Sequence, residues 1–195
     1  MVSISITGSR GGIGTSTFAW ALARVSAAHA LLDYSSSQAL HWVIGKPDLV
    51  LDWPSTLDSL AEPPDIAKLL SNSNSVEGVQ VFSGGQPIGR DFTGENKLVI
   101  IDGDCSADFQ IHHTTNAFQD IESSNSKADY VVMRQVRGGV PLRINPQKFD
   151  YAYRSESNVS RSLNNGLGLH TKSRVQKIAK QISADILRDS STDHR

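Results

Sequence analysis

Apolar and polar residues alternate at the start of the chain and then recur at helical spacing. Residues 2–7 alternate and end at Gly8, which predicts a strand followed by a tight turn. Residues 15–27 predict a helix, whose apolar positions are Phe18, Ala21, Leu22 and Val25. Residues 30–32 are apolar and precede Asp33, so they predict a second strand. Strand, loop, helix and strand in this order form a βαβ unit, which favours a parallel sheet.

The rest of the chain predicts short strands and short helices in alternation. Further strands are expected over residues 79–82, 97–101, 109–113 and 130–133. Short helices are expected over residues 40–44, 53–60, 65–70 and 115–124, with a polar loop over 71–75. The chain is then rich in Gly, Asn and Ser up to Gly168, and an amphipathic helix follows from Ser173 to Leu187.

Length, charge and cysteine content narrow the class of protein. The 195 residues suit one domain and can bury a sizeable core. Nineteen Lys and Arg residues balance 20 Asp and Glu residues, so we expect no nucleic-acid partner. A single cysteine, Cys105, cannot form an internal disulfide, which suits the reducing cytosol. No signal-peptide pattern and no run of roughly 20 apolar residues is present, so we expect a cytoplasmic protein.

The segment between the first strand and the first helix, residues 9–17, is called the glycine loop below. Its glycines let the backbone wrap closely with positive φ, so that successive N–H groups point inward. The N-terminus of the following helix adds partial positive charge. The loop therefore predicts a phosphate-binding site made largely of main-chain amides. The expected binding residues are Arg10, Gly11, Gly12, Ile13, Gly14, Thr15, Ser16 and Thr17.

Two motifs fit the glycine loop, and they imply different functions. The Walker A pattern, G-x-x-x-x-G-K-[ST], places Ser16 at the Mg²⁺-binding hydroxyl but has Thr15 in place of lysine. The T-G-x-x-x-G-I-G pattern of NAD(P)-dependent short-chain dehydrogenases also matches, from Thr7 to Gly14. That family needs a Tyr with a Lys four residues on, and this pair is missing at Tyr130, Tyr151 and Tyr153. A dehydrogenase, or a glycine turn without a ligand, remain the alternatives.

Beyond the motif, the chain resembles the ParA/MinD group of P-loop ATPases. Arg10 to Ser16 is similar to the group's K-G-G-x-G-K-[TS] loop. The run Gly14-Thr15-Ser16-Thr17 resembles the CpaE/TadZ branch, which positions pilus and secretion machinery, and within it the septum-site-determining (Ssd) proteins of actinobacteria. Residues 31–45 and 51–54 resemble further elements of that branch, and residues 98–102 resemble a Walker B strand. The resemblance covers residues 2–133 and is looser beyond them.

This resemblance implies a homodimer that binds ATP and Mg²⁺. In it Arg10 would reach the partner's phosphates, and Ser16 and Asp102 would hold the metal. Asp33 is retained as the catalytic candidate, but Ser35 stands where the group has its catalytic aspartate, and Thr15 lacks the lysine charge. We therefore expect a deviant Walker A protein with weak or absent ATP hydrolysis, or a scaffold that binds no nucleotide.

The implied partners are a pilus or secretion ATPase or division proteins, which would give a polar or membrane-associated location. The last helix resembles the one with which MinD contacts membranes, but we expect it to cover the sheet instead. Cys105, His112 and His113 match no zinc spacing. We thus expect a three-layer P-loop NTPase-like α/β fold over residues 1–189, with a mainly parallel sheet flanked by helices, and a disordered tail over 190–195.

Overall fold

A computed structural model of the chain describes residues 2–35, 39–45, 74–83, 97–121, 127–144, 148–165, 167–170 and 172–192. Its strands are β1 (Val2–Gly8), β2 (Ala30–Asp33), β3 (Asn74–Val76), β4 (Val79–Ser83), β5 (Leu98–Asp102), β6 (Phe109–Thr115), β7 (Tyr130–Gln135) and β8 (Tyr151–Arg154). Its helices are α1 (Thr15–Val25), α2 (Leu40–Ile44), α4 (Phe118–Ile121), the 3₁₀ turn η1 (Leu142–Ile144), α5 (Ser157–Asn164) and α6 (Arg174–Thr192). The helices predicted over 53–60 and 65–70 lie outside the described residues.

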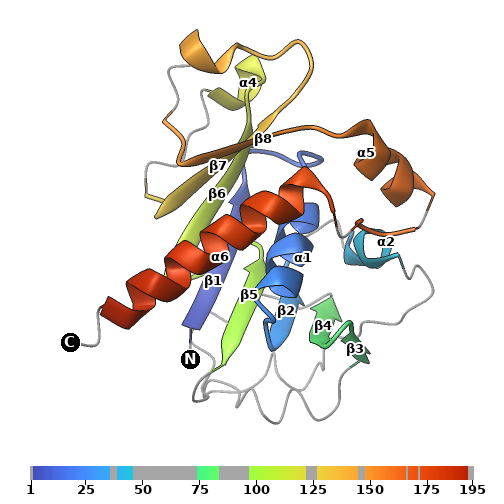
Figure 1. The fold of residues 1–195 in the computed structure, drawn as a ribbon, viewed down its shortest axis with the longest axis vertical. Helices are drawn as coiled ribbons and strands as arrows, with labels where there is room; N and C mark the ends of the chain where they lie inside the picture. The colour runs from blue at the N-terminus through green and yellow to red at the C-terminus, as the bar shows by residue number, and fades with distance from the viewer. Residues whose placement is uncertain are drawn as a thin grey trace.

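The eight strands form one sheet in the order β3-β4-β2-β5-β1-β6-β7-β8. Every neighbouring pair is parallel except the β3–β4 hairpin (Figure 1). The mainly parallel α/β fold expected from the sequence is therefore confirmed. β5 lies between β1 and β2, whereas the first two strands of a dinucleotide-binding fold are neighbours. This strand order argues against the dehydrogenase alternative.

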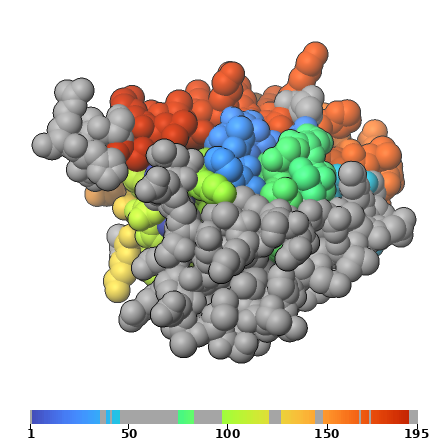
Figure 2. All heavy atoms as spheres, turned by 90° about the horizontal axis from the view of Figure 1, so that it is seen from below, coloured from blue at the N-terminus to red at the C-terminus, as the bar shows by residue number. Residues whose placement is uncertain are grey.

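Helices α1 and α6 pack against each other over one face of the sheet (Figure 1). Every residue of α1 from Phe18 to Ala23 is buried, because the helix is enclosed between the sheet and α6. The apolar stripe of α6 is also buried, through Val175, Ala179, Ile182 and Ile186. From below, α6 lies along the same side of the molecule as the β3–β4 hairpin (Figure 2). Among the described residues, no helix is long and apolar enough to cross a bilayer.

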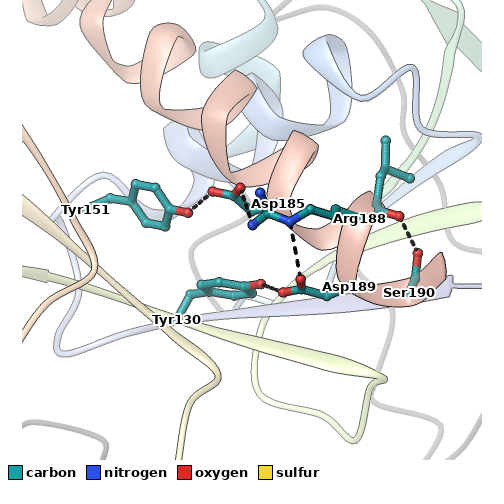
Figure 3. Close-up of polar contacts among 7 residues, drawn as sticks. Tyr130, Tyr151, Asp185, Arg188, Asp189 and Ser190 are labelled. Atoms are coloured by element: carbon teal, nitrogen blue, oxygen red, sulfur yellow. Dashed lines mark hydrogen bonds and ion pairs between the residues drawn. The ribbon is translucent and has the colours of Figure 1, made fainter. Parts of the chain in front are cut away.

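Two tyrosines hold the last turns of α6 against the sheet (Figure 3). Tyr130 of β7 donates its hydroxyl to Asp189 at 2.6 Å, and Tyr151 of β8 donates to Asp185. Arg188 lies between the two carboxylates, with its Nη2 at 2.8 Å from Asp185 Oδ1. α6 itself extends to Thr192, past residue 190, where the disordered tail was expected to begin. Residues 193–195 lie outside the described part of the chain.

Three further expectations need correction. Asn74–Val76 forms strand β3 where a polar loop was predicted, because Glu77 and Gly78 take positive φ and close a tight hairpin with β4. The helix predicted over 115–124 begins later than expected, since Thr115 pairs in β6 and α4 starts at Phe118; residues 122–124 lie outside the described residues. The polar segment before Gly168 holds β8 and α5, neither of which was predicted.

Candidate functional site

The glycine loop connects the end of β1 to the start of α1, and its own sequence determines its shape. Gly12 and Gly14 have φ of 76° and 95°, a region that other residues rarely adopt. Ile13 is 1% exposed and anchors the loop in the core. The Ser9 amide donates to the carbonyl of His113 at 3.1 Å, which ties the loop to β6. The exposed tip of the loop is thus held from both sides.

Thr15, which stands at the Walker A lysine position, lies beside the end of β1. A Cβ atom on Gly8 would overlap with Thr15 Oγ1 and would come within 3.2 Å of Ile13 Cδ1. Gly8 therefore permits the loop to fold back over the strand that precedes it. Because threonine is short and uncharged, Thr15 brings no positive charge to this point.

A cleft of about 660 Å³ opens beside the glycine loop, at the carboxyl ends of β1, β2 and β5. The loop contributes all of its predicted binding residues except Ile13, whose side chain is buried: Arg10, Gly11, Gly12, Gly14, Thr15, Ser16 and Thr17. The opposite walls include Tyr34, Ser35, Asp102, Asp104 and His112. Ligands of open α/β sheets bind at this edge of the strands.

Asp102, at the end of β5, is a buried carboxyl group in this cleft. Burial raises its pKa to about 7, and the neighbouring charge of Asp33 acts in the same direction, while a hydrogen bond from Ser16 opposes the shift. Its Oδ2 is buried without a hydrogen-bond partner among the described residues. Ser16 and Asp102, the two residues predicted to hold Mg²⁺, are thus brought into contact.

Asp33, the catalytic candidate, pairs in register with Asp102 across β2 and β5. It is fully buried and is not among the residues that line the cleft. Its Oδ1 accepts hydrogen bonds from the Ser35 amide at 2.9 Å and from the Ser35 hydroxyl. Ser35, rather than Asp33, therefore forms the wall of the cleft at this point.

Asp104 and His112 line the cleft, but they were not assigned to the site from the sequence. Asp104 follows Asp102 in an Asp-Gly-Asp run, and that spacing could have pointed to it. His112 was considered only as a metal ligand with Cys105 and His113. It is 3% exposed, and its Nδ1 lies 3.4 Å from Thr7 Oγ1. In the described part of the chain, no group of three or more His, Cys, Asp or Glu side chains could hold a metal ion by itself.

Solved structures share this architecture. No protein-family model and no curated protein sequence matches the chain. A chain of the MinC:MinD cell division protein complex of Aquifex aeolicus superposes with a TM-score of 0.70 at 11% identity, with 96% of each chain covered. The ParA family ATPase of Chlorobium tepidum gives 0.65 at 15% identity, covering 94% of this chain and 98% of that one. The chain has the fold of ParA/MinD ATPases.

A third structure adds a ligand to the comparison. The putative plasmid partition protein of Borrelia burgdorferi, solved with bound AMPPNP, superposes with a TM-score of 0.63 at 15% identity, over 96% of this chain and 99% of that one. These identities establish the fold of this chain and not its activity. Its chemistry must be argued from the cleft itself.

Proposed function

We propose that this chain is a nucleotide-binding positioning factor of the ParA/MinD kind, which binds ATP with Mg²⁺ and hydrolyses it slowly or not at all. The observation that carries the proposal is the cleft beside the glycine loop. Its volume, about 660 Å³, lies within the range of small-molecule sites. One wall is made of loop residues at the N-terminus of α1, where main-chain amides and the helix dipole favour phosphate.

The residues at the end of β5 suit Mg²⁺ that arrives with a nucleotide. Mg²⁺ prefers oxygen ligands and usually takes one or two from the protein, with phosphates and waters completing its shell. Ser16 supplies a hydroxyl and Asp102 a carboxylate whose Oδ2 has no partner among the described residues. Bound Mg²⁺ would provide charge neutralisation for the phosphates. Ser16 and Asp102 would hold it, and loop amides would orient the phosphate chain.

Slow hydrolysis follows from the side chains that are missing. Thr15 brings no charge to the phosphates, and Ser35 lines the cleft where the ParA/MinD group has its catalytic aspartate. Asp33 lies behind Ser35 and accepts its hydrogen bonds. In enzymes, loss of one hydrogen-bond donor to the transition state reduces the catalytic rate by roughly two to three orders of magnitude. The cleft therefore supports binding better than turnover.

A protein that binds ATP without rapid turnover can still switch between two states of association. Arg10, Gly11 and Gly12 are exposed at the rim of the cleft, where a second copy of the chain would approach. Arg10 could there contact the partner's phosphates, because guanidinium pairs well with phosphate oxygens. By its resemblance to the CpaE/TadZ and Ssd proteins, we propose that such a cytoplasmic homodimer positions a pilus or secretion ATPase or division proteins.

Thermal unfolding with different ligands tests the nucleotide. ATP with Mg²⁺ should raise the Tm in a concentration-dependent way, whereas NADPH should leave it unchanged. Asp102→Asn should weaken the Mg²⁺ dependence, and Asp129→Asn, an exposed carboxylate outside the cleft, serves as the matched control. If neither ligand raises the Tm, the chain is a scaffold that binds no nucleotide. A shift with NADPH alone would instead support an oxidoreductase.

Self-association needs its own measurement. Sedimentation of the full chain with AMPPNP and Mg²⁺ should show a dimer that is absent without nucleotide. Arg10→Gln should shift the distribution back toward monomer, because it removes the cation at the rim. A monomer under all these conditions would contradict the proposed switch while leaving nucleotide binding intact.

A further inference from the structure

Arg134, near the end of β7, lies against the glycine loop. Its Nη1 is 2.9 Å from the position that a Cβ atom on Gly14 would occupy. Gly14 is the residue that caps the N-terminus of α1. Strand β7, which is separated from β1 by β6 in the sheet, thus places a guanidinium group beside the N-terminus of α1, where the glycine loop ends.

This placement brings the positive charge of the Arg134 guanidinium close to the positive end of the α1 helix dipole. The N-terminus of α1 carries a partial positive charge from the helix dipole. Arg134 makes no ion pair within the described residues, and its Nε is buried there without a hydrogen-bond partner. A cation in this position is unfavourable unless an anion lies close to both groups.

The groups around Arg134 are uncharged or are paired with other residues. His113, whose Cε1 lies 4.0 Å from the same Cβ position, is fully buried, and its pKa is lowered to about 3, so it is neutral. The hydroxyl of Tyr153 lies 2.9 Å from His113 Nε2 and is also uncharged, because burial raises its pKa. Glu156 lines the same small cavity of about 90 Å³, but its carboxylate is paired with Arg174: Oε2 accepts the Arg174 amide at 2.6 Å, and Oε1 lies 3.8 Å from Arg174 Nε.

We propose that Arg134 supplies, from behind the glycine loop, the positive charge that Thr15 does not provide, and thereby favours ligands with long phosphate chains. Arg134 does not line the large cleft itself. The small cavity that it does line shares Gly14 and Thr17 with the cleft, so its field reaches the phosphates across the loop. This inference rests on the proposed function, because it names the group that selects among ligands of the same site.

Calorimetric titration of ATP, ADP and AMP tests the charge. Arg134→Gln should weaken ATP binding about tenfold, ADP less and AMP least, because the attraction grows with ligand charge. Arg134→Lys should retain most of the affinity for ATP. Arg137→Gln, which removes the same charge from an exposed position three residues away, is the matched control and should leave all three affinities unchanged.

The outcomes separate this inference from the proposed function. Unchanged ATP affinity in Arg134→Gln overturns the inference, and so does an equal loss for ATP and AMP, which would indicate a contact with the nucleoside. A loss in Arg134→Lys as large as in Arg134→Gln points to shape rather than charge and overturns it too. If Arg134→Gln does not fold, Arg134→Met takes its place.

Inorganic tripolyphosphate provides the remaining comparison. If wild-type protein binds tripolyphosphate but not ATP, the proposed nucleotide function is wrong. In that case the role of Arg134 still holds if Arg134→Gln binds tripolyphosphate about tenfold more weakly than wild-type protein, the same loss as expected for ATP. If wild-type protein binds neither ligand, both the function and the inference fall.

Discussion

Arg10 Nε donates a hydrogen bond to Asp120 Oδ1 over 2.7 Å, and the carboxylate that receives it is 1% exposed. The other oxygen of Asp120 accepts a hydrogen bond from Thr115, at the end of β6. The rim of the glycine loop is therefore tied to a buried carboxylate that lies 110 residues away in the sequence. Arg10 has a structural role in this state, in addition to the role at a dimer interface that we propose.

A double-mutant cycle measures this ion pair. Arg10→Gln should lower the free energy of unfolding by about 1 kcal/mol, because Asp120 loses a cation while Arg10, 48% exposed, is partly screened by water. Asp120→Asn in the same chain should recover most of that loss, since a neutral amide needs no cation. Arg188→Gln, at an exposed ion pair, should change stability by no more than about 0.5 kcal/mol. Strict additivity in urea unfolding would show that the pair is not coupled.

Three glycines of the loop should respond differently to alanine. Gly11 has open space around a Cβ and no positive φ, so Gly11→Ala should change the free energy of unfolding by less than about 0.5 kcal/mol. Gly12 has open space but a φ of 76°, which should make alanine destabilising by about 1 kcal/mol. Gly14 combines a φ of 95° with close contact to Arg134, so its substitution should be the most damaging. Denaturant midpoints that do not follow this order would contradict the loop geometry.

Asp102 should make stability depend on pH. Its pKa is 3.8 in its unperturbed state and about 7 when folded, so between these values the folded chain holds a proton that the unfolded chain releases. Its contribution is fully present below pH 4 and is lost as the pH rises through 7. Asp102→Asn removes the buried charge and should raise the Tm at pH 8 by roughly 5 °C, with little change at pH 4.

The exposed neighbour provides the comparison for this pH dependence. Asp104→Asn should leave the Tm unchanged at both pH values, because Asp104 is exposed and its charge needs no compensation. Equal Tm values for Asp102→Asn and wild-type protein at pH 8 would mean that burial does not raise the pKa of the Asp102 carboxyl group.

Local patterns in the sequence predicted the centre of the fold. β1, α1, β2 and β5 were expected within a few residues of their observed bounds, because apolar runs and a glycine loop specify them without reference to distant residues. Their parallel pairing then brings Ser16 and Asp102 together at one edge of the sheet. The candidate metal pair itself was named from the Walker A pattern and from the resemblance of residues 98–102 to a Walker B strand.

The contacts around β1, α1, β2 and β5 depend instead on strands that are distant in the sequence. β8 and α5 are formed by a polar segment that shows no clear periodicity, and β8 obtains its hydrogen bonds from β7. Nothing near Arg134 in the sequence indicates that it lies beside Gly14, since the packing of β7 against β6 determines that approach. The same holds for Asp120 and Arg10. Such pairings arise from the tertiary structure and leave no local signal.

Restoring the missing lysine tests whether Thr15 limits the site. Thr15→Lys extends a cation from the start of α1, so ATP affinity should rise about tenfold in calorimetric titration. Hydrolysis should stay close to background, because Ser35 still provides no carboxylate. Adding Ser35→Asp to Thr15→Lys should then raise the rate of phosphate release about a hundredfold, since both charged groups that support transfer are present.

Thr15→Met is the matched control, because it adds length without charge. Its ATP affinity should not exceed that of wild-type protein. A gain equal to that of Thr15→Lys would show that filling the space beside Gly8, rather than charge, improves binding. Rapid hydrolysis by the wild-type chain would have a different meaning: it would require a catalytic group other than Thr15 and Ser35. Asp33 and Asp104, the carboxylates beside and within the cleft, would then be the first residues to substitute.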